Sequence, residues 1–302
     1  MAFESPLRYP GGKGKLAPFI KYIIIQNELK NGVYVEPYAG GAGVACSLLL
    51  SGVVSKIIIN DADRSIWAFW ESLKLYSEEL CNRINNTPIS IEEWRRQKAI
   101  QKIPEIPTID LGFSTFFLNR TNVSGVLSGG VIGGYAQEAT YGIDARFNKI
   151  DLIDRIRKLA ALSAQIEVHN MDAIDFLDTI ESELNKKSLI YFDPPYFVKG
   201  QALYRNYYTE EDHKLIAERI KKIETPWICS YDNAPEIIGL YEMTQKYIYD
   251  ISYSARCRNV GQEAIFFSQS LIIPKIESPF QIKQLPSRDN NLKFKIIQNP
   301  IG

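Results

Sequence analysis

The sequence predicts a doubly wound α/β fold, a Rossmann-like parallel sheet that a long and mostly helical insertion interrupts. Short apolar runs alternate with helical patterns in both halves of the chain. A glycine-rich turn, PYAGGAG, follows the first of these runs, and a later run ends in the letters DPPY. Alternation of this kind predicts a parallel sheet because parallel strands need long crossover connections, usually helices.

The N-terminal part of the chain supplies the first strand–helix–strand unit. Apolar residues recur at helical spacing over residues 13–29, which predicts a helix. Residues 33–36 form a short strand, the glycine-rich turn follows, and residues 44–50 form an apolar helix. The run SKIIIND predicts a second strand that ends at Asp61. Residues 33–61 therefore open the doubly wound sheet.

A different pattern occupies residues 65–159, where mostly helical spacing replaces the alternation. Near its end this segment contains GVLSGGVIGG, in which glycines are interleaved with β-branched residues. That composition predicts a β-hairpin over residues 124–134. We therefore expect a domain at 65–159, inserted into a main domain made of 1–64 and 160–273.

Strand–helix alternation resumes after the insertion. Residues 166–169 and 188–192 are predicted strands, and residues 173–184 and 210–223 are predicted helices. The segment PWICSYDN gives a further strand, and EAIFFSQSLII is expected to close the sheet as a terminal hairpin. Residues 274–302 are polar and marked by prolines, which predicts a loose C-terminal tail.

The composition is that of an ordinary globular protein. The 302 residues are 45% apolar and 23% charged, and no apolar run is long enough to span a bilayer. The N-terminus lacks a signal-peptide pattern, so we expect a cytoplasmic protein with no membrane partner. Zero net charge gives no support to bulk electrostatic binding of nucleic acid, although it allows a local basic groove. Four scattered cysteines and two histidines have no metal-ligand spacing, so no metal is predicted.

The letters YFDPPY join a buried strand to an abrupt stop. Residues 188–192 favour a central parallel strand, and Asp193, Pro194, Pro195 and Tyr196 follow it. Neither proline can donate to a sheet ladder, and each has a fixed φ. Taken alone, the motif fits a capped strand end as well as it fits a catalytic site.

The glycine-rich turn predicts a cofactor site. Its glycines allow the backbone to approach a ligand closely at a helix N-terminus, and structural packing is the alternative explanation. Asp61 ends the next strand, where a carboxylate can accept hydrogen bonds from ribose hydroxyls. A dinucleotide and S-adenosylmethionine both fit this arrangement. The dinucleotide fingerprint is incomplete, because Cys46 stands where its third glycine belongs.

The segment YPGGKGK at residues 9–15 is a weak match to a phosphate-binding P-loop. No buried strand precedes it, and Leu16 follows Lys15 where a P-loop has Ser or Thr. Its glycines are instead expected to bend the chain so that Lys13 meets a negative group, such as a ligand carboxylate. A solvated lysine is the alternative.

Six motifs occur in an order that resembles the Dam-like DNA adenine methyltransferase family. They are RYPGGK, VEPYAGGAG, IIIND, FFLNRTNVSG, MDAIDFL and YFDPPY, and they extend over most of the chain up to about Ile273. DPPY alone is shared with other amino-group methyltransferases, whereas the ordered set is much more specific. The resemblance implies a Rossmann-like, S-adenosylmethionine-dependent methyltransferase domain, with a target-recognition domain inserted after the second strand.

The resemblance also assigns residues to the cofactor. It implies that Asp61 binds the ribose, Asp172 the adenine of the cofactor, and that Asp193 lies near the reacting end. Tyr9 stands where some relatives carry tryptophan. The complete expected set is Tyr9, Lys13, Glu36, Pro37, Gly40, Asp61, Asp172 and Asp193.

The DPPY motif then has a chemical explanation. The 6-amino nitrogen of adenine is a poor nucleophile because its lone pair is conjugated with the ring. The Asp193 carboxylate and the Pro194 carbonyl, held by consecutive prolines, can accept its two hydrogens. Tyr196 is expected to stack on an extruded base, since a duplex base cannot reach such a pocket without flipping out. Direct methyl transfer needs no metal or covalent intermediate, so positioning is the main catalytic device.

DNA contacts are expected from the insertion and from one later loop. Asn119, Arg120 and Ser124 are predicted DNA-binding residues at the hairpin, and Arg256 is predicted to bind phosphate. The alternatives are that Asn119 and Arg120 only buttress the hairpin, and that Arg256 lies in a solvated loop.

We therefore expect methylation of the 6-amino group of adenine in double-stranded DNA, with S-adenosylmethionine as cofactor. A cognate restriction endonuclease is a candidate partner, and an orphan or phage-borne enzyme is equally open. The alternatives are an amino-methyltransferase acting on cytosine or RNA, a nicotinamide-dependent oxidoreductase, and a DNA-binding protein that has lost catalysis. The DPPY motif and the missing third glycine count against the oxidoreductase.

Overall fold

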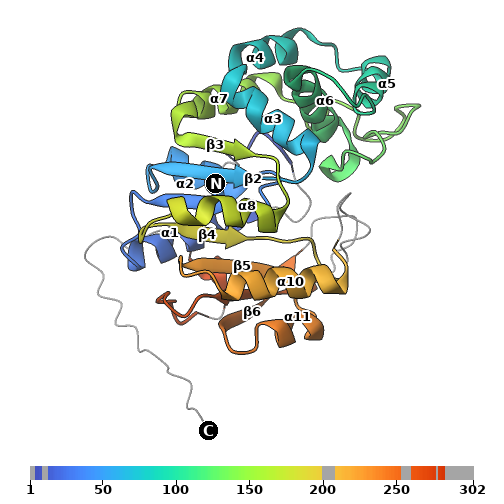
Figure 1. The fold of residues 1–302 in the computed structure, drawn as a ribbon. Helices are drawn as coiled ribbons and strands as arrows, with labels where there is room; N and C mark the ends of the chain where they lie inside the picture. Colours follow the sequence, from blue (N-terminus) through green and yellow to red (C-terminus); the bar gives the residue numbers. More distant parts are fainter. Residues whose placement is uncertain (1–3, 9–12, 199–207, 253–259, 277, 283–302) are drawn as a thin grey trace.

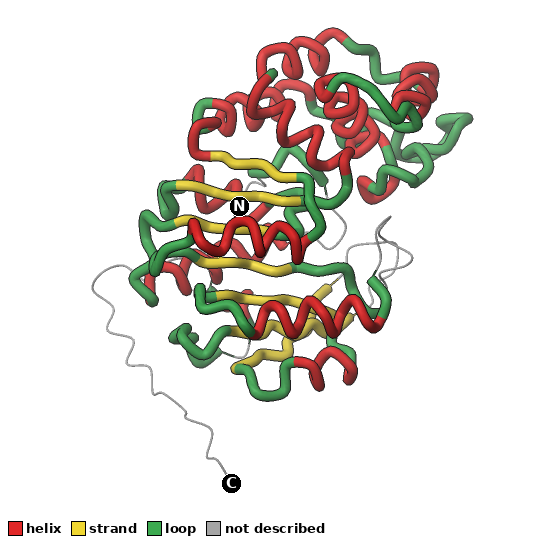
Figure 2. The backbone as a smooth tube through the Cα atoms, viewed as in Figure 1, coloured by secondary structure: helices red, strands yellow, loops and turns green. Residues whose placement is uncertain are grey.

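The structure is a computed structural model that describes residues 4–8, 13–198, 208–252, 260–276 and 278–282. A single sheet runs through the lower part of the molecule with helices on both of its faces, and a helical unit lies beside the edge formed by β3 (Figures 1 and 2).

Within the described residues, seven strands form one sheet in the order β3-β2-β1-β4-β5-β7-β6. Strands β1 to β5 are parallel, and β7 runs antiparallel between β5 and β6. The predicted doubly wound sheet is confirmed, and its strand order reverses between β1 and β4. The strands are β1 (Val33–Glu36), β2 (Lys56–Asn60), β3 (Ile166–His169), β4 (Leu189–Phe192), β5 (Trp227–Asp232), β6 (Gln245–Ser252) and β7 (Val260–Phe267).

Both faces of the central strands are buried. On β4, Leu189 and Tyr191 belong to one apolar cluster, whereas Ile190 and Phe192 belong to a second cluster on the opposite face. Strands covered on both sides need no polar alternation, which explains their continuous apolar runs. The covering helices are α1 (Ala17–Gln26) and α2 (Gly43–Leu50) on one face, and α8 (Ala173–Ile180), α10 (Glu210–Lys221) and α11 (Pro235–Leu240) on the other.

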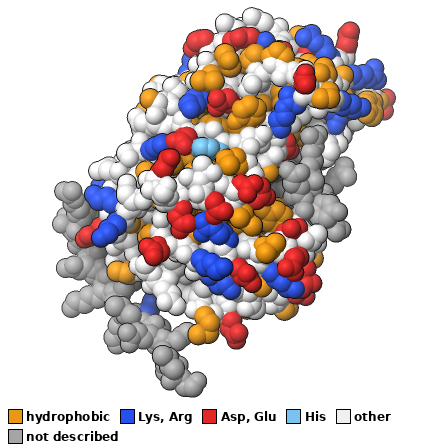
Figure 3. Space-filling view, viewed as in Figure 1, with side chains coloured by type: hydrophobic (Ala, Val, Ile, Leu, Met, Phe, Trp, Pro, Cys, Tyr) orange, Lys and Arg blue, Asp and Glu red, His pale blue; other side chains and the backbone are white. Residues whose placement is uncertain are grey.

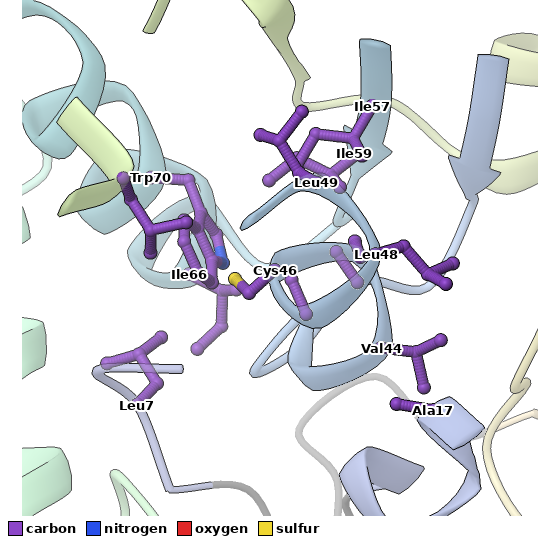
Figure 4. Close-up of a cluster of buried hydrophobic side chains, with 14 of the residues drawn as sticks. Leu7, Ala17, Val44, Cys46, Leu48, Leu49, Ile57, Ile59, Ile66 and Trp70 are labelled. Atoms are coloured by element: carbon purple, nitrogen blue, oxygen red, sulfur yellow. The ribbon is translucent and has the colours of Figure 1, made fainter. Parts of the chain in front are cut away.

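Helix α2 lies at the centre of the first cluster (Figure 4). Val44 points toward Ala17 of α1, and Leu49 lies beside Ile59 of β2. On the other side, Cys46 packs near Trp70 of the helical unit. A helix surrounded in this way can be apolar on every side, as the sequence of α2 is.

The helix predicted over residues 13–29 is divided in two. A short 3-10 helix, η1 (Lys13–Leu16), precedes α1. Pro18 in the first turn of α1 lacks the N–H that would continue a helix from its N-terminal side, so the regular helix begins there. This division brings Lys13 into a tight turn rather than a regular helix.

The helical insertion lies between β2 and β3. Asp63, Ser90 and Asn148 cap helices by accepting from backbone N–H groups within the first turn. The first buried cluster continues from α1 and α2 into these helices, so the insertion shares its core with the sheet. Its helices are α3 (Arg64–Leu75), α4 (Ser77–Asn86), α5 (Ile91–Ile100), α6 (Thr108–Thr121) and α7 (Lys149–Ala160).

The prediction of a β-hairpin over residues 124–134 is wrong, because this segment does not form two paired strands. The segment starts with a 3-10 turn, η2 (Val123–Gly125), and its only ladder contact in the described structure is an isolated antiparallel bridge between Asn122 and Val131. Gly125, Gly133 and Gly134 all have positive φ. These left-handed positions bend the chain too often for two regular strands to pair.

The C-terminal hairpin also differs from its prediction. The segment EAIFFSQSLII contributes only β7, whose hairpin partner is β6, a strand that the sequence patterns did not identify. Beyond β7, the Asn27 side chain of the α1 C-cap exchanges two hydrogen bonds with the backbone of Ile272. The predicted loose tail is therefore partly ordered: η5 (Pro279–Gln281) forms, and the Phe280 ring lies 5.5 Å from that of Tyr249.

Acidic and basic side chains are interspersed on the face drawn in Figure 3, as a net charge of zero suggests. No helix in the described ranges is both long and apolar enough to cross a bilayer. The described residues also contain no group of three His, Cys, Asp or Glu side chains that could hold a metal ion.

Candidate active site

The candidate site lies at the carboxyl ends of β1, β2 and β4, beside the point where the strand order reverses. Glu36 ends β1, Asp61 directly follows β2, and Asp193 directly follows β4. In open α/β sheets, ligands bind in the crevice at this switch point. The sheet therefore gathers three acids that are far apart in the sequence.

The glycine-rich turn after β1 contains two left-handed backbone positions. Gly40 and Ala42 both have left-handed φ angles, of 46° and 43°. The Gly40 N–H donates to Asp61 Oδ2 at 2.8 Å, and its carbonyl accepts from Trp70 Nε1 at 3.0 Å. The buried Pro37 accepts through its carbonyl from Asn60 Nδ2 at 3.0 Å. These bonds fix the turn against β2 and against the insertion.

Glu36 is buried beneath the start of α2. Its Oε1 accepts from the Ala45 N–H at 3.1 Å, which satisfies a donor of the first helical turn. Burial raises the pKa of Glu36 to about 8. The backbone of Gly14 also packs against this helix start, since a Cβ on Gly43 would lie 3.2 Å from the Gly14 Cα. The Glu36 side chain and the Gly14 backbone therefore cover the N-terminus of α2.

Asp61 holds two backbone donors with its two oxygens. Oδ2 accepts from Gly40 N–H, and Oδ1 accepts from Asp63 N–H at 2.9 Å. Burial, and next the neighbouring Asp63 carboxylate, raise the pKa of Asp61 to about 7. Each oxygen still has a lone pair, so the half-buried carboxylate can accept further hydrogen bonds from a ligand.

Asp172 lies beyond β3 as the N-cap of α8. Its side chain accepts from the Ile174 N–H at 2.8 Å, and it is exposed. The preceding Met171 is tied to the end of β2 by hydrogen bonds with Asn60. Asp172 therefore lies close in the fold to the strand end that carries Asp61.

Asp193 is bonded to side chains of two other elements. Its Oδ1 lies 3.0 Å from Lys13 Nζ and accepts from Ser230 Oγ at 2.8 Å. Burial raises the pKa of Asp193 above its usual value, although the Lys13 ammonium opposes this. The side chain is 24% exposed, so it remains accessible to a substrate. Lys13 was expected beside a ligand carboxylate, and the negative groups that it meets here are Asp193 and Glu263.

Tyr196 does not have the open ring face that was expected for base stacking. The residue is 2% exposed. Its hydroxyl accepts from Lys13 Nζ at 2.8 Å and donates to Glu263 Oε1 at 2.6 Å. In this conformation Tyr196 therefore supports Lys13, because a covered ring cannot receive a base.

The backbone after DPPY is fixed by β5. The Asp232 carboxylate accepts from the N–H groups of Phe197 and Val198, each at 2.9 Å. The Tyr38 hydroxyl, from the glycine-rich turn, lies 2.9 Å from the Tyr208 hydroxyl. Side chains from separate elements thus hold the catalytic and cofactor loops together.

A family model described as "D12 class N6 adenine-specific DNA methyltransferase" matches residues 9–254, which is most of the chain. The chain belongs to this family.

Two further similarities were found. The D12 chain is 23% identical over 210 residues to the Type II methyltransferase M.MjaIII of Methanocaldococcus jannaschii, over 65% of this chain and 70% of that protein. A crystal structure of protein LPL1258 from Legionella pneumophila covers 90% of each chain, with 13% sequence identity and a TM-score of 0.30. Membership of the family makes this protein an adenine-specific DNA methyltransferase, with DNA as its substrate class.

Asn119 and Arg120, which were predicted to contact DNA, point into the protein. Asn119 is fully buried, and its side chain bonds to the N–H and carbonyl of Arg8 and to the carbonyl of Gly125. Arg120 is 7% exposed and donates through its guanidinium to the Pro6 carbonyl. Burial lowers the pKa of Arg120 to about 9. Their position fits the buttressing alternative, and they anchor the segment that leads to Lys13.

Of the two other predicted DNA-binding residues, Ser124 is described by the structure and Arg256 is not. Ser124 is exposed and has a left-handed φ of 58°, so its position allows a contact with DNA. Tyr9, expected at the cofactor, and Arg256, expected at phosphate, lie outside the described residues.

Three residues of the D12 site were missed by the sequence patterns. Ser230 bridges Asp193 and Tyr191, Asp232 holds the backbone after DPPY, and Glu263 bonds Lys13 and Tyr196. A signal was present for two of them, because Ser230 and Asp232 are polar residues in the otherwise apolar run of β5. Glu263 follows Gly261 and Gln262 in β7, so no such contrast marks it in the sequence, although it is fully buried.

Proposed function

We propose that this D12 enzyme uses S-adenosylmethionine to methylate the 6-amino group of an adenine that has been extruded from double-stranded DNA. The observation that carries the proposal is the position of Asp193 at the switch point, bonded to Lys13 and Ser230 and partly open to solvent. Glu36, Gly40 and Asp61 lie at the neighbouring strand ends.

The residues present suit S-adenosylmethionine better than a dinucleotide. A dinucleotide places its pyrophosphate on the N-terminus of the first helix. Here the Glu36 carboxyl group already accepts from Ala45 N–H, and the Gly14 backbone covers the helix start. A pyrophosphate would therefore find one donor of the helix start already used, and it would have to displace the Gly14 backbone. This argues against the nicotinamide-dependent oxidoreductase.

The cofactor would be held by residues from three strand ends. Asp61 offers carboxylate lone pairs for ribose hydroxyls, and Asp172 lies at the neighbouring strand end, where the adenine of the cofactor is expected. The Gly40 turn, with Glu36 and Pro37 beneath it, forms the floor between them. When bound, S-adenosylmethionine supplies a methyl group made electrophilic by its positively charged sulfur.

Asp193 has the properties of an acceptor for the target amino group. As a carboxylate it can accept one amino hydrogen and draw the nitrogen toward a tetrahedral geometry. Lys13 and Ser230 both bond Oδ1, which fixes the carboxylate and leaves Oδ2 for the substrate. Pro194 has a fixed φ and Pro195 has no N–H, so the Pro194 carbonyl is suited to accept the second hydrogen.

The insertion is proposed as the target-recognition domain, with the exposed Ser124 turn as a contact to DNA. The position of Asp193 at the end of a central strand supports extrusion of the base, because a base within a duplex would not reach it. The name of the Methanocaldococcus relative, a Type II methyltransferase, motivates a narrower proposal. Methylation by this chain would protect DNA from a cognate restriction endonuclease.

The first prediction tests the chemistry. Asp193→Asn keeps the size of the side chain but removes the anionic acceptor, and turnover should fall about 100-fold or more. The measurement is transfer of labelled methyl from S-adenosylmethionine to an adenine-containing duplex, with 2-aminopurine fluorescence to follow base extrusion. Asp154→Asn, at an exposed carboxylate of α7, is the matched control and should keep wild-type turnover.

Three results would contradict the proposal. These are near wild-type turnover by the Asp193 variant, a preference for cytosine or RNA by the wild type, and tight binding of a nicotinamide dinucleotide. Sequencing that maps methylated adenine in DNA from cells expressing the protein would give the target motif. An endonuclease that cuts the same motif should then fail to cut that DNA.

A further inference from the structure

A second carboxylate lies beneath the predicted catalytic one. Glu263 is on β7, paired with Asp232 of β5 on one side and with Tyr249 of β6 on the other. It is fully buried, with an exposed fraction of 0%. Burying a carboxylate is costly unless hydrogen bonds and an opposite charge compensate for lost hydration. The groups bonded to Glu263 therefore show how its buried charge is compensated.

Each oxygen of Glu263 has a partner. Oε1 accepts from the Tyr196 hydroxyl at 2.6 Å and lies 3.3 Å from Lys13 Nζ. Oε2 accepts from the Tyr249 hydroxyl at 2.7 Å. The carboxylate thus connects the DPPY motif, η1 and the edge strand of the sheet at one point.

The hydrogen bonds form a directed chain from Lys13 through Tyr196 to Glu263. Lys13 Nζ donates to the Tyr196 oxygen at 2.8 Å, and the Tyr196 hydroxyl donates in turn to Glu263. The same ammonium lies 3.0 Å from Asp193 Oδ1. Since Lys13 is shared between two carboxylates, Glu263 limits how closely the ammonium can associate with Asp193.

We propose that Glu263 is a positioning residue for methyl transfer, which holds Lys13 and Tyr196 so that Asp193 stays available as an acceptor. The inference rests on the proposed function, because it assigns Asp193 the role of binding the target amino group. Glu263 itself need not touch the substrate. It acts through Lys13 and Tyr196.

The negative charge of Glu263 is as important as its shape. Asp193 lies near charged and titratable groups from several elements. They are Lys13 of η1, Tyr34 and Glu36 of β1, Tyr191 of β4, Tyr196 of the DPPY segment, Cys229 and Tyr231 of β5, Tyr249 of β6 and Glu263 of β7. Burial has the largest effect on the pKa of Asp193; in addition, Lys13 lowers this pKa and Glu263 raises it. Without the Glu263 charge, Lys13 would pair with Asp193 alone, and that carboxylate would be a weaker acceptor.

Glu263→Gln tests this, because glutamine keeps the shape but has no charge. We expect kcat for methyl transfer to duplex DNA to fall about 10- to 100-fold. The dissociation constant for S-adenosylmethionine should change less than about threefold, since the interaction acts in the transition state. The acid limb of the pH–rate profile should move to lower pH, because Asp193 ionises more readily when a nearby negative charge is removed.

Two further variants separate charge from geometry. Glu263→Asp keeps the charge but shortens the side chain, so kcat should stay reduced while the acid limb remains at the wild-type pH. Tyr249→Phe removes only the bond to Oε2 and should give a smaller loss of kcat than Glu263→Gln. Glu93→Gln is the matched control, since Glu93 of α5 is also a buried carboxylate bonded to a neighbouring side chain, Gln97. It should leave kcat and the pH profile unchanged.

The inference is overturned if folded Glu263→Gln has the wild-type kcat and the wild-type acid limb. If that variant does not fold, Tyr249→Phe decides: a wild-type kcat in the folded protein rejects the proposal. A purely structural role would lower the unfolding temperature without moving the acid limb.

A measurement without turnover distinguishes this inference from the proposed function. Carbon-13 NMR of labelled aspartate carboxyls in the free protein, assigned with Asp193→Asn, reports the titration of Asp193 directly. That titration should move to lower pH in Glu263→Gln, and an unchanged titration contradicts the inference. Absence of methyl transfer by the wild type contradicts the proposed function instead.

Discussion

At the scale of single residues, burial determines what the acids of this site can do. Glu36, Asp61 and Asp193 all lie at strand ends, and burial raises the pKa of each of them. The protonation of Glu36 and Asp61 therefore changes in or near the physiological range rather than near pH 4. For this reason we expect S-adenosylmethionine to bind more tightly as pH rises, because Asp61 ionises. We expect the folded state to become less stable as pH rises, because Glu36 loses its proton.

Asp61 should make cofactor binding pH-dependent. Its pKa of about 7 means that about half of the free protein has a protonated Asp61 at that pH, and the protonated carboxyl group is a weaker acceptor for ribose hydroxyls than the carboxylate is. The dissociation constant for S-adenosylmethionine should therefore rise about tenfold between pH 8 and pH 6. Calorimetry at both pH values measures this. Asp61→Asn should bind more weakly at pH 8 and should lose most of the pH dependence; an equal dependence in the variant would exclude Asp61 as its origin.

Glu36 should make the folded state less stable as pH rises. Its pKa is raised from 4.5 to about 8, so the native protein retains a proton that the unfolded chain releases. The resulting stability is present at low pH and is lost progressively between about pH 4.5 and pH 8. Glu36→Gln has no such proton to lose, so its free energy of unfolding should fall less between pH 5 and pH 8, by about 2 kcal/mol or more. Urea denaturation at both pH values tests this, and parallel pH dependence of the two proteins would contradict it.

At the scale of elements, close backbone approach decides how the insertion packs. Helix α6 is buried on nearly every side and crosses α3 at Gly112. A Cβ at Gly112 would meet Ser72 Oγ and would lie 2.5 Å from the Ala68 carbonyl oxygen. The same helix ends in Asn119 and Arg120, which hold the segment that leads to Lys13. The packing of α6 therefore connects the insertion to the active site.

Gly112→Ala should weaken this packing. The added methyl group would force α3 and α6 apart, at a cost of about 1–3 kcal/mol in the free energy of unfolding. Gly239→Ala in α11 is the control, because nothing lies within 4 Å of the position that its added methyl group would take. This variant should be neutral, or more stable by up to about 1 kcal/mol. Denaturant unfolding of both variants gives the comparison. Equal stabilities would show that α3 and α6 adjust without cost.

At the scale of the whole molecule, the insertion and the outer strands lie at opposite ends of the sheet. The helical unit is next to β3, and β6 forms the other edge beyond β5 and β7 (Figure 1). The net charge of zero provides no general attraction to DNA, so binding depends on where individual charges lie. A charge added at one end should therefore act differently from the same charge added at the other.

Ser124→Glu and Met243→Glu provide that comparison. Both positions are exposed, and both changes add one negative charge, but Met243 lies between α11 and β6. Ser124→Glu should weaken duplex binding roughly fivefold at low salt, and less at high salt, because the new charge repels phosphates. Met243→Glu should have little effect, and both variants should bind S-adenosylmethionine normally. Equal DNA affinities of the two variants would place the DNA-binding surface away from the Ser124 turn.

The sequence alone determined the parallel strands β1 to β5 and the motifs that end them. Strands β1 to β4 were predicted within a residue of their observed limits. The runs of β2 and β4 are the clearest, because strands buried on both faces are continuously apolar. The positions of Asp61 and Asp193 follow from that prediction, since residues after parallel strands share one edge of the sheet. The order of the motifs was also sufficient to identify the family, which the match over residues 9–254 establishes.

Tertiary structure alone decided which side chains meet. Lys13 reaches Tyr196, 183 residues away, and Glu263 joins them through the register of β7 with β5 and β6. Asn119 and Arg120 face inward rather than toward DNA because α6 is enclosed by the insertion. Local sequence patterns record which positions are apolar and where the chain turns. They do not record which distant polar group will compensate for burial of a charge, because that depends on the packing of the complete chain.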